Sequence, residues 1–242
     1  MKKTHVKLHA TIIVISLVLW LIFSFFISQL IIGLPMVWLL GKENFHSTFW
    51  TTIYTLLFYA LFLFLVLYIP PKVIKKLKAD RTELGLKDLP TWTDIGLAPV
   101  GFIVYILIAW LLTILMSNFP WFDAVEKQEL IFNNYYTVPD RILTFISLVV
   151  IAPIAEEIAF RGWLYGKLRA VIPKKWSIVI SALIVSAVFG ALHGQLNVAI
   201  NVGAMSLVLC AMREITGTVY SGIIFHMLKN AIAFYLLIVT GI

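Results

Sequence analysis

Charged residues are scarce in this sequence. Asp, Glu, Lys and Arg make up 13% of the 242 residues, whereas hydrophobic residues make up 61%. Soluble globular chains contain about 25% charged and about 45–50% apolar residues, so the charges here are too few to cover a soluble fold. The high hydrophobicity equally excludes a disordered chain, which is unfolded because it has too little apolar surface to bury.

Cysteine is also rare, and Cys210 is the single thiol of the chain. One cysteine cannot form an internal disulfide, so the sequence is not a small disulfide-stabilised scaffold. The net charge of +7 does not indicate a nucleic-acid partner, because the basic residues lie beside apolar runs. That arrangement is typical of membrane proteins, and we expect no nucleic acid to bind.

The sequence contains several long runs of uncharged, apolar residues. A helix rises about 1.5 Å per residue, so about 20 apolar residues cross a bilayer core about 30 Å thick. The runs predict an all-α, polytopic transmembrane bundle of about seven spans, with no soluble domain. The expected spans are 10–32, 48–69, 95–116, 141–157, 176–192, 196–212 and 218–239. An amphipathic surface helix is also expected within residues 119–140, where acidic and aromatic residues are mixed.

Lysine and arginine are unevenly distributed between the expected loops. The loops on the side of the amino terminus carry 14 of these residues, against three on the other side. Positively charged loops are retained in the cytoplasm, so we expect an integral membrane protein with a cytoplasmic amino terminus.

Ionisable residues inside a bilayer cost about 2.5–3.5 kcal/mol each, so they are found where they pair, line a hydrated cavity or take part in function. In this chain they are concentrated in the last four spans. We therefore expect two parts, an amino-terminal membrane region at 1–137 and a catalytic helical core at 138–242 whose four helices enclose the cavity. The residues concerned are Glu156, Glu157, Arg161, His193, His226 and Lys229, together with the amide Asn230. Lys229 is expected to line the wall or to extend toward the interface, without a catalytic role.

The spacing of the first three residues separates their roles. Glu157 and Arg161 are four residues apart, so on a helix they share a face and can form an ion pair. Glu156 lies about 100° around the helix and lacks this local partner. A buried carboxylate without a partner holds a proton more readily, which makes Glu156 the candidate general base for activating water.

The remaining polar residues come from two later spans. Phe189 and His193 are four residues apart, as are His226 and Asn230, so each pair shares a helix face. We expect His193 to help hold the water that Glu156 activates. We expect His226 and Asn230 to donate hydrogen bonds to the oxyanion of an attacked amide.

Three motifs thus occur in order on apolar helices: Glu-Glu-x-x-x-Arg at 156–161, Phe-x-x-x-His at 189–193 and His-x-x-x-Asn at 226–230. In these motifs the sequence resembles the CPBP (Abi) family of membrane proteases, which includes type II CAAX prenyl endopeptidases and bacterial bacteriocin-immunity proteins. The resemblance covers about residues 138–238. It implies an intramembrane endopeptidase of the bacterial cell membrane that cleaves a membrane-associated peptide or protein near its carboxy terminus. It also implies the same six residues as the site, with Glu157 and Arg161 supporting the base. Related proteins often have eight spans, whereas seven are counted here.

Three alternatives remain open at this stage. Glu156, His193 and His226 also suit three zinc ligands with a fourth position for water, although the favoured mechanism needs no metal or other cofactor. The same charges suit the relay of a proton-coupled transporter. A non-catalytic immunity or adaptor protein would keep the helices without the chemistry.

Overall fold

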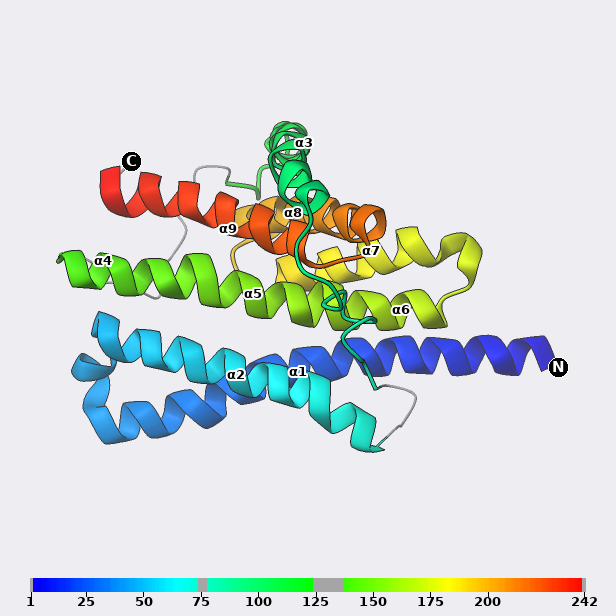
Figure 1. The fold of residues 1–242 in the computed structure, drawn as a ribbon, viewed down its shortest axis with the longest axis horizontal. Helices are drawn as coiled ribbons and strands as arrows, with labels where there is room; N and C mark the ends of the chain where they lie inside the picture. The colour runs from blue at the N-terminus through cyan, green and yellow to red at the C-terminus, as the bar shows by residue number, and fades with distance from the viewer. Residues whose placement is uncertain (1, 74–77, 124–136, 241–242) are drawn as a thin grey trace.

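The computed structural model describes residues 2–73, 78–123 and 137–240, and every regular element within them is helical. The elements are α1 (Lys2–Phe45), α2 (Thr48–Val73), α3 (Trp92–Met116), α4 (Val138–Phe145), the π-helical η2 (Ile146–Ile151), α5 (Ala152–Glu157), the π-helical η3 (Ile158–Tyr165), α6 (Gly166–Val171), α7 (Lys174–Ala191), α8 (Leu196–Thr216), α9 (Tyr220–Phe234) and the π-helical η4 (Tyr235–Thr240). The segment from α4 to α6 forms one continuous rod through the middle of the molecule (Figure 1). Helices α1 and α2 pack together on one side of this rod, whereas α7, α8 and α9 lie on the other and α3 packs on α8 and α9.

Seven helical segments in the described residues are long and apolar enough to cross a membrane. This confirms the prediction of an all-α bundle of about seven spans and of an integral membrane protein. The segments are Ala10–Phe45, Thr48–Pro70, Trp92–Met116, Val138–Val171, Lys174–Ala191, Leu196–Thr216 and Tyr220–Thr240. The surface helix expected within 119–140 lies largely outside the described residues, because residues 124–136 are not among them.

Two predicted spans were too short. The first helix does not stop at residue 32 but continues to Phe45, with a bend at Gly41, whose φ of 75° is outside the helical range. The fourth does not stop at residue 157 but continues to Val171. Trp163 and Leu168 on this extension are completely buried. The extension therefore stays helical because it has a buried apolar face, although it also carries the basic residues from which a loop was predicted.

Local capping signals begin two of the helices. The Thr91 side chain accepts a hydrogen bond from the backbone N–H of Asp94, and the backbone N–H of Thr91 donates to the Asp94 carboxylate in return. Thr137 and Asp140 repeat this arrangement at the start of α4. Such a reciprocal cap satisfies backbone donors that a helix start leaves without partners. Asp94 is completely buried and also accepts a hydrogen bond from Thr218. The cap of α3 thus ties this helix to the turn between α8 and α9.

Basic residues of distant segments meet at one end of the bundle. Lys167 Nζ on α6 lies 2.7 Å from Glu83 Oε2 and 2.8 Å from the carbonyl oxygen of Lys78, both in the segment after α2. Arg213 on α8 donates to the carbonyl of Glu83 at 2.9 Å. These contacts place the predicted basic segments at the same end as the amino terminus of α1 (Figure 1). That this end is cytoplasmic stays a prediction.

Helices α7 and α8 approach each other closely at Gly190. A Cβ atom on Gly190 would lie 2.4 Å from the carbonyl oxygen of Ala199, well inside van der Waals contact. Small residues allow membrane helices to pack this closely. The short turn between α7 and α8 contains Gly194, whose φ of 77° is a conformation that glycine adopts without strain. The approach brings the end of α7, and with it His193, toward the centre of the bundle.

Gly190→Ala is accordingly expected to destabilise the protein by about 1–3 kcal/mol, because the added methyl group must push two backbones apart. The change is measured as a lower thermal unfolding midpoint of the purified protein in detergent. Gly96→Ala is the matched control, since a Cβ atom there meets nothing within 4 Å and alanine favours a helix. Equal unfolding midpoints for both variants would show that the α7–α8 contact does not limit stability.

Candidate active site

The central rod carries the Glu-Glu-x-x-x-Arg motif at the boundary between α5 and η3. Glu157 and Arg161 are almost completely buried, and Arg161 Nη1 donates to Glu157 Oε1 at 3.0 Å. The ion pair expected from the four-residue spacing is therefore present. Glu156 is also buried but points to different partners, as the 100° step between neighbouring helical residues requires.

His226 on α9 connects the two glutamates. Its Nδ1 atom lies 3.1 Å from Glu157 Oε1, and its Nε2 atom lies 3.9 Å from Glu156 Oε2. The ionised carboxylate accepts the hydrogen bond, so Nδ1 is the protonated nitrogen of this pair. Glu157 thus orients the imidazole in the way that a buried carboxylate orients a catalytic histidine, and Nε2 is directed to Glu156.

Glycine at position 222 makes room for this arrangement. A Cβ atom on Gly222 would lie 2.9 Å from Glu157 Oε2, closer than side chains normally approach. Because Gly222 is four residues before His226, it lies on the same face of α9. The absence of a side chain at 222 therefore allows α9 to lie directly against the Glu157 carboxylate.

Phe189 on α7 holds the three motifs together. Its ring centroid lies 4.3 Å from the guanidinium carbon of Arg161. The same ring lies 5.1 Å from the ring of His193 and 6.0 Å from the ring of His226. A cation above an aromatic face is attracted electrostatically, so Phe189 stabilises the charge of the buried arginine. The structure thus brings residues 161, 193 and 226 around one aromatic side chain.

His193 lies on the turn that follows α7. Its Nδ1 atom lies 2.8 Å from the carbonyl oxygen of Phe189, so Nδ1 carries the proton and Nε2 is left as an acceptor. Burial lowers the pKa of the His193 imidazole below its ordinary value, although the nearby carboxylate of Glu156 acts in the opposite direction. The ring is therefore neutral near pH 7.

Asn230 has a different contact from the one that its expected role suggests. Its Nδ2 atom donates to the carbonyl oxygen of Leu148 at 2.9 Å. In the π-helical η2 the N–H of Ala152 bonds to Ser147, five residues back, and so does not reach Leu148. The residue five positions after Leu148 is Pro153, which has no N–H. Asn230 therefore satisfies a carbonyl that its own helix leaves without a donor, and its second amide proton has no partner among the described residues.

Lys229 lies near the same groups, and its charge interacts with Glu156. It also acts on His193, whose protonated form it disfavours. That Lys229 lines the wall of the site without a catalytic role stays a prediction.

Tyr59 is the site residue that the sequence analysis did not identify. It lies on α2, is buried, and donates its hydroxyl hydrogen to Glu156 Oε1. A weak signal was available in the sequence, because Thr48, Thr52, Thr55 and Tyr59 recur at helical spacing within an otherwise apolar span. Such a polar stripe on a membrane helix indicates a face that contacts other protein groups.

The zinc alternative concerns the donors of Glu156, His193 and His226. In the described parts of the chain, no three His, Cys, Asp or Glu side chains lie together as ligands of one metal ion would. Tyr59 contacts Oε1 of Glu156 and Glu157 contacts Nδ1 of His226, so Oε2 and Nε2 are the atoms of these two residues that face each other. A site that needs no metal stays a prediction.

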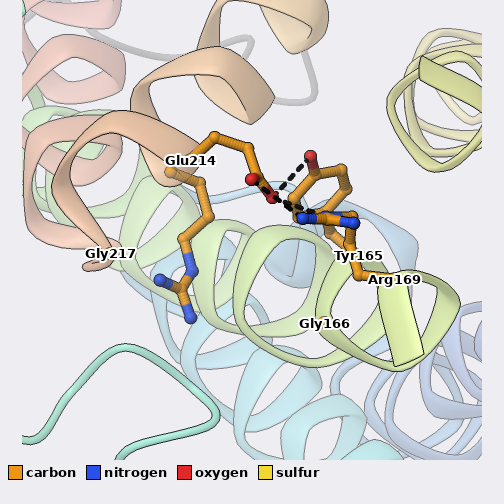
Figure 2. A pocket seen from close by; sticks show the side chains of 6 residues that line it. Tyr165, Gly166, Arg169, Glu214 and Gly217 are labelled. Atoms are coloured by element: carbon orange, nitrogen blue, oxygen red, sulfur yellow. Dashed lines mark hydrogen bonds and ion pairs between the residues drawn. The ribbon is translucent and has the colours of Figure 1, made fainter. Parts of the chain in front are cut away.

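A separate pocket of about 300 Å³ opens at the end of the bundle, away from the six predicted site residues. Figure 2 shows Glu214 of α8 directed at Tyr165 and Arg169 of the central rod. Glu214 Oε1 lies 2.6 Å from Arg169 Nε and 3.0 Å from the Tyr165 hydroxyl. This cluster links two helices at the basic end, and its arginine is already neutralised by Glu214.

The fold and the buried cluster of carboxylates, imidazoles and guanidinium define a polytopic membrane protein with a polar site inside its helices. Residues 138–232 match the protein family described as Type II CAAX prenyl endopeptidase Rce1-like. The matched region contains all three motifs, and the match supports the resemblance to the CPBP (Abi) family and its CAAX-type intramembrane proteases. No curated protein and no solved structure was found to match the chain.

Proposed function

We propose that this protein is an intramembrane endopeptidase in which Glu156 activates water for attack on a peptide bond of a membrane-associated substrate. The observation that carries the proposal is the 3.9 Å separation between Glu156 Oε2 and His226 Nε2 in a buried environment. This distance is too long for a direct hydrogen bond, yet it allows one water molecule to contact both atoms. His193 Nε2, an acceptor, supports the same water.

The proposed reaction begins when Glu156 Oε2 removes a proton from the water. The water oxygen forms a bond to the carbonyl carbon of the substrate, and the carbonyl oxygen becomes an oxyanion. The carbon–nitrogen bond then breaks, and the proton held by Glu156 passes to the leaving amine. Every atom is accounted for by one water and one peptide, so no step requires a metal ion or another cofactor.

His226 and Asn230 are the proposed donors to the oxyanion. Because His226 Nδ1 donates to Glu157, donation from Nε2 requires the doubly protonated ring. Asn230 contributes its second amide proton, since the first is used by Leu148. Preorganised donors of this kind are worth about 2.7–4 kcal/mol each in known oxyanion sites.

Incubation of the purified protein with a peptide library, with and without a chelator, tests the proposal. We expect cleavage products to appear by mass spectrometry and their amounts to be unaffected by the chelator. Products that disappear with the chelator and return with zinc would contradict the metal-independent mechanism. Absence of products from the protein in proteoliposomes would contradict the peptidase and favour an immunity or adaptor role.

A further inference from the structure

The carboxylate of Glu156 accepts a hydrogen bond from a residue that lies outside the region matched by the family. Its Oε1 atom accepts the hydroxyl hydrogen of Tyr59 on α2, whereas the family match begins only at residue 138. Both side chains are buried, so water does not compete for this hydrogen bond. A hydrogen bond from a hydroxyl to an ionised carboxylate is also about twice as strong as one between neutral groups.

The rotation of α2 that directs Tyr59 to Glu156 has an identifiable origin. The hydroxyl of Ser147 in η2 lies 3.2 Å from the hydroxyl of Thr52. Thr52 is seven residues, about two turns, before Tyr59, so both lie on one face of α2. Apolar packing supports the same rotation, because Phe62 contacts Phe160 with ring centroids 6.5 Å apart.

The π-helical turn of the central rod is needed for both contacts to form. Ser147 and Glu156 are nine residues apart, and nine steps of about 100° would place them on opposite faces of a regular α-helix. The turns of η2, which lie between them, contain more residues than α-helical turns and so rotate the chain less per residue. Both residues consequently face α2, where they meet Thr52 and Tyr59.

With Oε1 occupied by Tyr59, the second oxygen of Glu156 is the one directed to His226, at 3.9 Å from Nε2. The charged or titratable groups that act on this carboxylate include His193, His226 and Lys229, and the Glu157–Arg161 ion pair contacts His226 in turn. Tyr59 is the neutral donor among these partners. It fixes the plane of the carboxylate without forming an ion pair that would neutralise it.

We infer that Tyr59 is a positioning residue for Glu156, and that the amino-terminal helix α2 is therefore part of the site. Its hydroxyl holds Oε1 so that Oε2 faces the position of the attacking water. This inference rests on the proposed function, in which Glu156 is the base. Tyr59 itself touches neither the substrate nor the water, and it acts only through the orientation of Glu156.

Tyr59→Phe tests the inference, since it removes the hydroxyl and keeps the ring in the aromatic packing. For a library peptide that the protein cleaves, we expect kcat to fall about 10- to 100-fold, because small displacements of a catalytic group have effects of this size, while KM changes less than about twofold. Tyr54→Phe is the matched control. Tyr54 lies on the same helix, stacked on Phe58 with ring centroids 6.0 Å apart, whereas the hydroxyl bound to Glu156 is that of Tyr59.

Infrared spectroscopy provides a measurement that needs no substrate. The band of the Glu156 carboxyl group is identified by its loss in Glu156→Gln, and we expect Tyr59→Phe, but not Tyr54→Phe, to shift this band. An unshifted band, or an unchanged kcat in Tyr59→Phe, would overturn the positioning role and leave the proposed function standing. Full cleavage by Glu156→Gln would instead overturn the proposed function, and the positioning role with it.

Discussion

Glu156→Gln is expected to lower the rate of peptide cleavage by about 10²- to 10⁴-fold, the usual contribution of a general base. An amide has nearly the size of the carboxylate but cannot accept a proton from water near neutral pH. The carbonyl oxygen of Gln still accepts the hydrogen bond from Tyr59, so the packing around position 156 is preserved. The loss therefore reports on chemistry rather than on folding.

The rate is measured as product formed from a cleaved library peptide, with wild type and variant reconstituted at equal amounts. Glu43→Gln is the matched control, because Glu43 is exposed near the end of α1 and far along the chain from the site. We expect the control to cleave at the wild-type rate. Undiminished cleavage by Glu156→Gln, with both variants showing wild-type unfolding midpoints, would remove Glu156 from the role of base.

Arg161→Met is expected to destabilise the protein by about 3–5 kcal/mol, the cost of leaving one partner of a buried ion pair uncompensated. Glu157 is completely buried, and after the substitution its carboxylate would retain only the contact with His226. Methionine fills much of the arginine volume, so the loss arises from charge more than from a cavity. Thermal unfolding in detergent, followed by tryptophan fluorescence, measures the change.

Two further variants separate the charge effect from simple loss of packing. Arg169→Met breaks a partly exposed ion pair with Glu214 and is expected to cost about 1 kcal/mol or less. Arg161→Met combined with Glu157→Gln is expected to unfold at a higher temperature than Arg161→Met alone, because no buried charge then lacks a partner. Equal midpoints for the single and double variants would show that the ion pair is not the origin of the loss. Catalysis should not return in the double variant, since Glu157 also orients His226.

The membrane spans could be predicted because bilayer crossing is a local requirement. Hydropathy and length are properties of a short segment, and they located the seven spans found in the described residues without any knowledge of neighbours. The ends of the spans were less accessible to this reasoning. The helix containing Glu156 continues to Val171 because Trp163 and Leu168 are buried against other helices. A hydropathy pattern within one segment does not reveal which other helices pack against it.

The motif residues were predictable for a similar reason, because an ionisable group in an apolar helix stands out at once. Their contacts were not predictable. The sequence predicted Asn230 as an oxyanion donor but gave no sign that one of its amide protons is used for the carbonyl of Leu148, because of a π-helical turn and the missing N–H of Pro153. Tyr59 drew no attention, since a tyrosine in an aromatic-rich membrane span is ordinary until its partner is known.

The sequence by itself determined the class of fold, the approximate positions of the spans and the small set of polar residues that a bilayer tolerates only in protected positions. It did so because the energetic cost of a charge or a backbone group in lipid is paid residue by residue. The tertiary structure alone decided which of these groups meet. Glu156 lies between Tyr59, 97 positions earlier in the chain, and His226, 70 positions later. The two side chains reach the same carboxylate because of how three helices are rotated about their axes, and a π-helical turn alters the rotation of one of them.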